Sequence, residues 1–189
     1  MTGAEPADPR AARTRAALRR ALLEECERTP LSRIGVSALA RRAGVGRATF
    51  YTHYPDLTAL AVDACADVVR EAVDALHAWR GTPDPRVPPP ALAAFLAGLA
   101  PRLALHRELL APGGGGPLGD VLRRDLRERS RAERELVGAD RPELVASAVA
   151  GAFTAVLADW VHGRVPGDAD EVAGQVWRLL VALHRAPPA

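Results

Sequence analysis

The apolar residues of this chain recur at intervals of three and four along almost its whole length. Such spacing places them on one face of an α-helix. β-branched residues seldom alternate with polar ones, and aromatic residues make up only 4% of the chain, so the signals for β-strands are weak. The sequence therefore predicts an all-α protein of about nine helices.

Proline, glycine and acidic residues divide the chain into these helices. In the first third we expect helices over residues 11–28, 36–43, 47–53 and 56–79. Beyond them we expect helices over residues 91–110 with a break at Pro101, over 118–137, over 140–162 and from 168 onward. Asp56, Asp140 and Asp168 are typical N-cap residues. Glu143 and Glu171 follow the last two at the spacing of a capping box.

Two connections and two apolar seams complete this outline. Residues 81–90 include five prolines, which predicts a stiff irregular connection. Residues 113–116 are four consecutive glycines, which predicts a flexible loop. The side chains expected to point inward from the helices at 118–137 and after 168 are Leu118, Leu122, Leu126 and Leu136, then Val172, Val176, Leu179, Leu180 and Leu183.

Charge is distributed unevenly along the chain. Residues 1–54 contain ten arginines and five acidic residues, a net charge of +5, whereas residues 55–189 contain fifteen arginines and eighteen acidic residues, a net charge of −3. Together they give the chain its net charge of +2. A basic N-terminal quarter on a slightly acidic remainder indicates one surface that meets an anion.

Several enzyme classes are excluded by composition. The chain contains no lysine, so it has neither a Walker-type phosphate loop nor a Schiff-base lysine. Cys26 and Cys65 are too few for a disulfide framework or a four-cysteine zinc site, and the five histidines lack metal-ligand spacing. No nucleophile–base pair, paired carboxylates or cofactor loop stands at a recognisable spacing. We therefore expect no enzymatic activity, cofactor or metal. Both cysteines are expected in the core, with redox sensing as the alternative.

No stretch of the sequence predicts a membrane segment. There is no run of eighteen uncharged apolar residues, and residues 1–10 lack the apolar core of a signal peptide. We expect a cytoplasmic protein that does not contact a membrane.

Two short helices separated by the glycine-containing turn Gly44-Val45-Gly46 are typical of a helix-turn-helix. The second helix of such a motif lies in the major groove of DNA, where its N-terminal residues reach base edges. Arg47 lies in that first turn, and its guanidinium can donate two hydrogen bonds to guanine. Arg41 and Arg42, which precede the turn, either add charge to this surface or remain solvated.

The run of residues 36–57, VSALARRAGVGRATFYTHYPDL, resembles the DNA-binding signature of the tetracycline-repressor-like (TetR) family of transcriptional regulators. The resemblance covers about residues 12–62 and rests on the Ala-Gly-Val turn, the Thr-apolar-Tyr-x-His-aromatic pattern and the cap that follows. It implies a helix-turn-helix DNA-binding domain over residues 10–56. It also implies a linking helix from residue 56 and a helical effector-binding and dimerisation domain over residues 57–189.

The resemblance assigns roles to residues that match the family pattern. It implies that Arg47 and Ala48 read bases, that Ser37 faces the DNA backbone, and that the phosphates are held by Thr49, Tyr51 and His53. Two positions depart from the pattern. Gly46 stands where a serine usually caps the recognition helix, and Leu57 stands where many members have a phosphate-binding lysine.

The resemblance also implies an effector chamber and a dimer. The candidate chamber residues are Trp79, Phe95, Leu99, Leu103, His106, Phe153 and Trp160, and each of them is equally compatible with an ordinary core. The helix at 140–162 is apolar nearly all round, so it needs cover on several sides. The candidate dimer-interface residues are Ala150, Gly151, Ala155, Val176 and Leu180.

These features together predict a homodimeric transcriptional repressor that binds double-stranded DNA at a palindromic operator and is released by an apolar small-molecule effector. The alternative is a helical protein-interaction module without specific DNA binding. An enzyme with an apolar chamber is a third class, which the missing catalytic groups disfavour.

Overall fold

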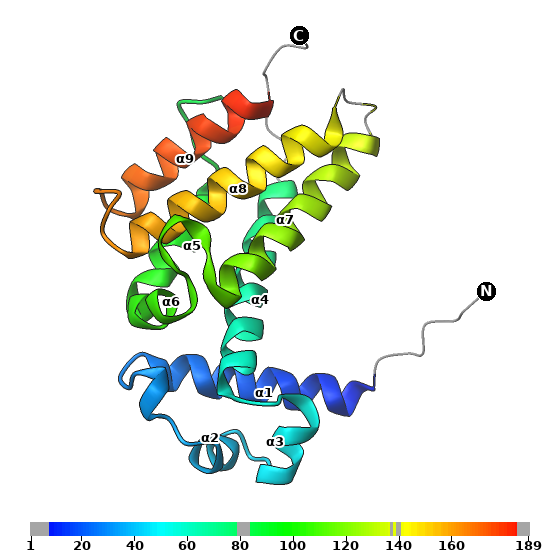
Figure 1. Cartoon of the computed structure of the whole chain (residues 1–189), viewed down its shortest axis with the longest axis vertical. Helices are drawn as coiled ribbons and strands as arrows, with labels where there is room; N and C mark the ends of the chain where they lie inside the picture. Colours follow the sequence, from blue (N-terminus) through cyan, green and yellow to red (C-terminus); the bar gives the residue numbers. More distant parts are fainter. Residues whose placement is uncertain (1–7, 79–83, 137, 139–140, 185–189) are drawn as a thin grey trace, which may run out of the picture. The chain divides into compact units, whose positions relative to one another are not determined.

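The computed structural model describes residues 8–78, 84–136, 138 and 141–184. These residues form α-helices and short 3₁₀ helices with no β-strand among them, which confirms the predicted all-α class (Figure 1). The α-helices are α1 (Pro9–Cys26), α2 (Val36–Arg42), α3 (Arg47–His53), α4 (Leu57–Ala78), α5 (Pro90–Leu99), α6 (Leu103–Leu109), α7 (Gly116–Leu136), α8 (Pro142–Val161) and α9 (Ala169–His184). The 3₁₀ helices are η1 (Leu31–Arg33), η2 (Ala100–Arg102) and η3 (Pro112–Gly114).

Helix ends follow the sequence signals closely. Asp56 caps α4, because its carboxylate accepts a hydrogen bond from the Ala59 amide at 2.7 Å. Asp168 and Glu171 form a reciprocal capping box before α9, with N–O distances of 3.1 and 2.9 Å. Pro101 separates α5 from α6, as predicted. The predicted cap Asp140 lies outside the described residues.

The chain divides into two compact units, Met1–Ala64 and Cys65–Ala189. The boundary between these two units falls within α4. The functional domains expected over residues 10–56 and 57–189 stay a prediction. The first two turns of α4, which contain the fully buried Leu60 and Ala61, belong to the first unit.

The first unit packs α1, α2 and α3 around a small core. Leu18 and Leu22 of α1, Leu39 of α2 and Phe50 of α3 are at most 2% exposed. The turn between α2 and α3 depends on Gly44, whose φ of 73° lies in the left-handed region that favours glycine.

The second unit is organised around α8. This helix lies between α7 and α9 and also contacts α6 and η3, while α5 packs against α9 (Figure 1). α8 is long and apolar enough to span a membrane by composition alone. Part of this apolar surface is buried in the second unit, at Ala146, Ala150, Leu157 and Val161.

Two residues predicted to point inward are exposed. Leu136 in the last turn of α7 is 86% exposed, and Leu179 of α9 is 39% exposed. The apolar spacing continues through both helices, but no part of the described chain covers these two side chains.

The glycine-rich segment at 113–116, for which the sequence predicts a flexible loop, includes the 3₁₀ helix η3 and packs against α8. Gly114 is buried, and a Cβ atom there would lie 3.0 Å from the Ala155 amide nitrogen of α8. The Gly113 amide donates to the Asp159 carboxylate at 3.1 Å, and the Ala111 amide donates to the Gly115 carbonyl at 2.9 Å. The absence of side chains therefore lets this segment lie directly against α8.

Gly119 provides a test of this packing. A Cβ atom at Gly119 would lie only 2.0 Å from the Gly114 carbonyl oxygen, whereas a Cβ atom at Gly98 of α5 would meet nothing within 4 Å. We expect Gly119→Ala to lower the free energy of unfolding by about 2–3 kcal/mol through overpacking. Gly98→Ala should raise it by up to about 1 kcal/mol through helix propensity. Urea denaturation measures both, and a stabilised Gly119→Ala variant would contradict the close approach.

Candidate nucleic-acid interface

Helices α2 and α3 form the predicted helix-turn-helix, and α3 has the predicted bounds. Each helix is seven residues long and buries only one side of its surface. Leu39, Ala40 and Phe50 face the core of the first unit. The residues predicted to contact DNA lie on the remaining surface: Ser37, Arg47, Ala48, Thr49 and Tyr51 are exposed and His53 is partly exposed.

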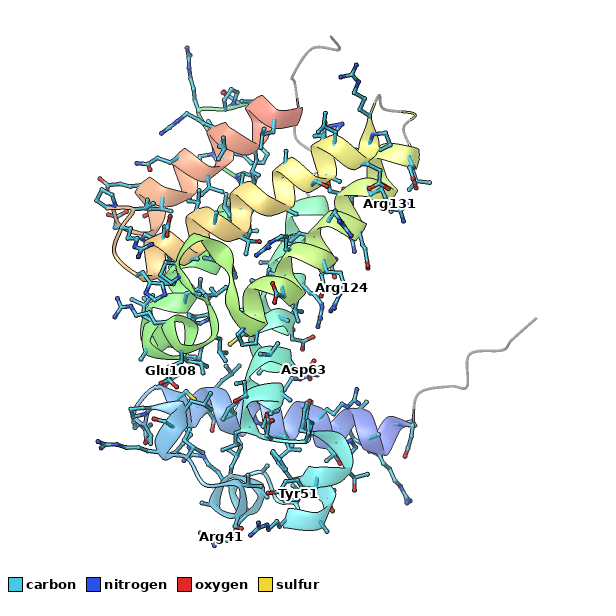
Figure 2. All side chains as sticks on the ribbon, viewed as in Figure 1. Arg41, Tyr51, Asp63, Glu108, Arg124 and Arg131 are labelled. Atoms are coloured by element: carbon cyan, nitrogen blue, oxygen red, sulfur yellow. The ribbon has the colours of Figure 1, made fainter. Side chains whose placement is uncertain are left out.

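Three of these side chains meet at one place. The Arg47 guanidinium donates a long hydrogen bond of 3.4 Å to the Ser37 hydroxyl, and it lies 5.6 Å from the centre of the Tyr51 ring. Tyr51 is 47% exposed and packs edge-on against the buried Phe50. Figure 2 labels Tyr51 on α3 and Arg41 on α2 in the part of the first unit that these helices form. We call this group of Arg47, Ser37 and Tyr51 the Arg47 cluster. It joins both helices of the motif.

The two arginines that precede the turn have different surroundings. Arg42 forms ion pairs with Glu25 at 2.8 Å and Glu24 at 3.4 Å, so its charge is directed toward α1. Arg41 is exposed and forms no ion pair within the described residues. Of the two, Arg41 is available to an external anion.

A hydrogen-bonded link that the sequence did not predict holds the end of α3. It consists of Tyr54, Asp63 and Arg19, and we call it the Tyr54 strut. Tyr54 is 5% exposed, and its hydroxyl donates to the Asp63 carboxylate of α4 at 2.6 Å. The same carboxylate oxygen lies 3.3 Å from the Arg19 guanidinium of α1. Burial and the neighbouring carboxylate raise the pKa of Tyr54 well above its usual value, so the hydroxyl remains a donor. The strut therefore joins α1 and α4 to the C-terminal end of α3.

The predicted effector-chamber residues that the structure describes belong to the second unit, and most of them are buried. Phe95 stacks on Phe153 with ring centres 6.3 Å apart, and both are buried. His106 is buried with Nδ1 2.8 Å from the Arg102 carbonyl oxygen, and burial lowers the pKa of its imidazole. The Trp160 indole donates to the Gly167 carbonyl at 3.1 Å. Leu99 is buried and Leu103 partly buried, and Trp79 lies outside the described residues. Their role as a chamber lining stays a prediction.

The predicted dimer residues divide into two groups. Ala150 and Val176 are 0% and 5% exposed within this single chain, and their role in a dimer stays a prediction. Their neighbours in the chain already cover them. Gly151, Ala155 and Leu180 are partly exposed, and their role stays a prediction.

Metal binding has no support among the described residues, where no group of three histidine, cysteine or acidic side chains could hold an ion. Cys26 and Cys65 are both buried and form no disulfide.

The missing cap of α3 gives a stability prediction. Gly46 has φ −75° and ψ 156°, a conformation open to any residue, and a Cβ atom there would lie 3.8 Å from the Thr49 hydroxyl. We expect Gly46→Ser to raise the free energy of unfolding by a few tenths of a kcal/mol, because its hydroxyl can accept a first-turn amide. Gly46→Ala offers no acceptor and should lower it. Equal effects of the two substitutions in chemical denaturation would rule out capping as the cause.

The Tyr54 strut gives a second prediction. Tyr54→Phe keeps the ring but removes the donor to Asp63, so we expect the free energy of unfolding to fall by about 1.5 kcal/mol. A double-mutant cycle with Asp63→Ala should show a coupling energy of about 1 kcal/mol. Strictly additive effects would mean that the hydroxyl–carboxylate contact does not stabilise the unit.

The fold matches solved structures of transcriptional regulators. A TetR transcriptional regulator from Rhodococcus sp. RHA1 aligns with 95% of this chain and 100% of its own, at 19% identity and a TM-score of 0.63. RolR without ligand aligns with 94% of this chain and 98% of its own, at 18% identity and a TM-score of 0.55. RolR in complex with resorcinol aligns with 95% of this chain and 97% of its own, at 20% identity and a TM-score of 0.50.

No protein-family model and no curated protein matches the sequence. The structural matches nevertheless extend over both units of the chain. The chain therefore has the fold of the TetR transcriptional regulators, with a helix-turn-helix unit followed by a helical second unit.

Proposed function

We propose that this protein is a cytoplasmic transcriptional repressor, without enzymatic activity, that binds a palindromic operator as a homodimer and leaves it when a small molecule binds. The observation that carries this proposal is the Arg47 cluster, an exposed arginine held between the two helices of a helix-turn-helix.

The exposed side chains of α2 and α3 suit two kinds of contact with DNA, one to bases and one to phosphates. Arg47 lies in the first turn of α3, where a side chain in the major groove reaches base edges, and Ala48 beside it can contact a thymine methyl group. The exposed Ser37, Thr49, Tyr51 and His53 carry hydroxyls and an imidazole that suit phosphate oxygens. The net charge of +5 on residues 1–54 favours the same ligand.

The surface of α8 and α9 supports a homodimer. Leu144 of α8 is 61% exposed, and Leu179 of α9 is 39% exposed. A Cβ atom at Gly151 would meet nothing within 4 Å, so a partner helix could approach α8 closely there. A symmetric dimer places two recognition helices one turn of DNA apart, which is why a palindromic operator is expected.

The second unit supports a response to a small molecule. One structure with this fold is RolR in complex with resorcinol. α4 contributes residues to both units, so an effector that prefers one position of α4 would shift the population of DNA-binding conformations.

Substitution of Arg47 tests the proposal. The wild-type chain should bind DNA from upstream of its own gene. The logarithm of its binding constant should fall linearly with the logarithm of the salt concentration. Arg47→Ala should weaken specific binding by about 1–3 kcal/mol and relax the base preference. Arg164→Ala removes the same charge from an exposed residue of the second unit and should leave binding unchanged. Fluorescence anisotropy measures the DNA affinity of the wild type and of both variants.

Two outcomes would contradict the proposal. Equal affinity of Arg47→Ala and wild type would overturn the assigned role of this residue. Salt-independent or absent binding, both to this DNA and in a selection from random sequences, would favour the protein-interaction module instead.

A further inference from the structure

A cavity of about 330 Å³ lies between α4 and α7 in the second unit. Its volume falls within the range of small-molecule sites. Its lining does not include the effector-chamber residues predicted from the sequence. Four aliphatic side chains from the two helices contribute its apolar part: Val69, Val73, Leu122 and Leu126.

The charged part of the lining contains two arginines that are already neutralised. Arg70 of α4 lies 2.6 Å from Asp125 of α7 and 3.8 Å from Asp67. Arg129 of α7 lies 2.8 Å from Asp74 of α4 and 3.2 Å from Glu133. Each guanidinium thus has two carboxylates beside it, and both arginines bridge the two helices across the cavity.

One carboxylate of the lining has no such partner. Glu128 is exposed and forms no ion pair within the described residues. Asp125 has a further neighbour in Arg124, at 3.5 Å, which Figure 2 labels on α7. The lining itself thus holds two arginines and three carboxylates, Asp74, Asp125 and Glu128.

We propose that this cavity binds an amphipathic cation, with the apolar body of the ligand against the aliphatic side chains and its ammonium group beside Glu128. If the protein is the repressor proposed above, this cation is its effector. An anionic ligand would have to draw an arginine away from two carboxylates. A neutral ligand covering the same residues would remove water from Glu128 and provide no compensating charge.

The position of the cavity links this ligand to α4. Arg70 and Asp74 of α4 are the groups whose ion pairs cross to α7. An ammonium group beside Glu128 adds positive charge to the lining that also holds the Arg70–Asp125 and Arg129–Asp74 ion pairs, so it repels both arginines and weakens the polar connection between the two helices. This is a differential interaction through which a ligand can select one position of α4.

A matched series of ligands tests the charge preference. 4-Phenylbutylamine, 4-phenylbutanol and 4-phenylbutanoate share one apolar body and carry a cationic, neutral or anionic head at pH 7. Isothermal titration calorimetry on the full chain without DNA should show the amine binding at least about fivefold more tightly than the other two. Tighter binding of the anion, or no binding of any of the three, would overturn the proposal.

Variants locate the site. Glu128→Gln should weaken binding of the amine about fivefold and leave binding of the alcohol unchanged. Glu108→Gln removes the same charge from an exposed residue of α6 (Figure 2). It should change binding of neither the amine nor the alcohol. Leu126→Trp, checked for folding by circular dichroism, should fill the cavity and weaken both. Unchanged amine binding in Glu128→Gln would place the cation elsewhere and refute the assignment.

The regulatory role is measured separately by adding the amine to the protein–DNA complex. Amine binding without release of DNA would refute the effector role and leave the site intact. Amine binding by a chain that fails to bind DNA would refute the repressor and not the site. Release of DNA by the amine in wild type, reduced in Glu128→Gln, is the result expected.

Discussion

The burial of Phe50 is the interaction on which the recognition surface depends. A seven-residue helix is too short to be stable by itself, and α3 has no side-chain cap at its N-terminus. Phe50 is its one fully buried residue, and it contacts the rings of Tyr51 and Tyr54 at 5.3 and 6.1 Å between centres. This anchor fixes the rotation of α3, and that rotation leaves Arg47 and Tyr51 on the surface. The exposed cluster is thus a consequence of the core behind it.

The sequence predicted those parts of the fold that local chemistry determines. The bounds of α3, the Asp56 cap, the capping box at Asp168 and the break at Pro101 depend on residues close together in the chain. The exposed set on α2 and α3 was predictable too, because helical periodicity separates it from Leu39 and Phe50.

What the sequence did not predict depends on contacts between distant segments. The Tyr54–Asp63 bond joins the end of α3 to α4, and nothing near Asp63 distinguishes it from a solvated carboxylate. The glycines at 113–116 resemble a flexible linker by composition, but in the structure Gly114 packs directly against α8. In the same way, periodicity alone could not indicate that Ala150 is covered within the chain or that Leu136 is not. The cavity between α4 and α7 arises from pairing of those helices, which no local pattern specifies.

The ion pairs of this chain distinguish arginines whose charge joins helices from arginines whose charge remains exposed. Arginine supplies every basic side chain other than histidine, so residue type alone says little about role. Arg19, Arg42, Arg70 and Arg129 each lie within 4 Å of a carboxylate on another helix, and their charge is largely used in joining helices. Arg47 instead contacts a hydroxyl and an aromatic face, neither of which neutralises it. Its positive charge is oriented by these contacts and still available to an anion. The role in reading DNA that we propose for Arg47 requires both of these properties.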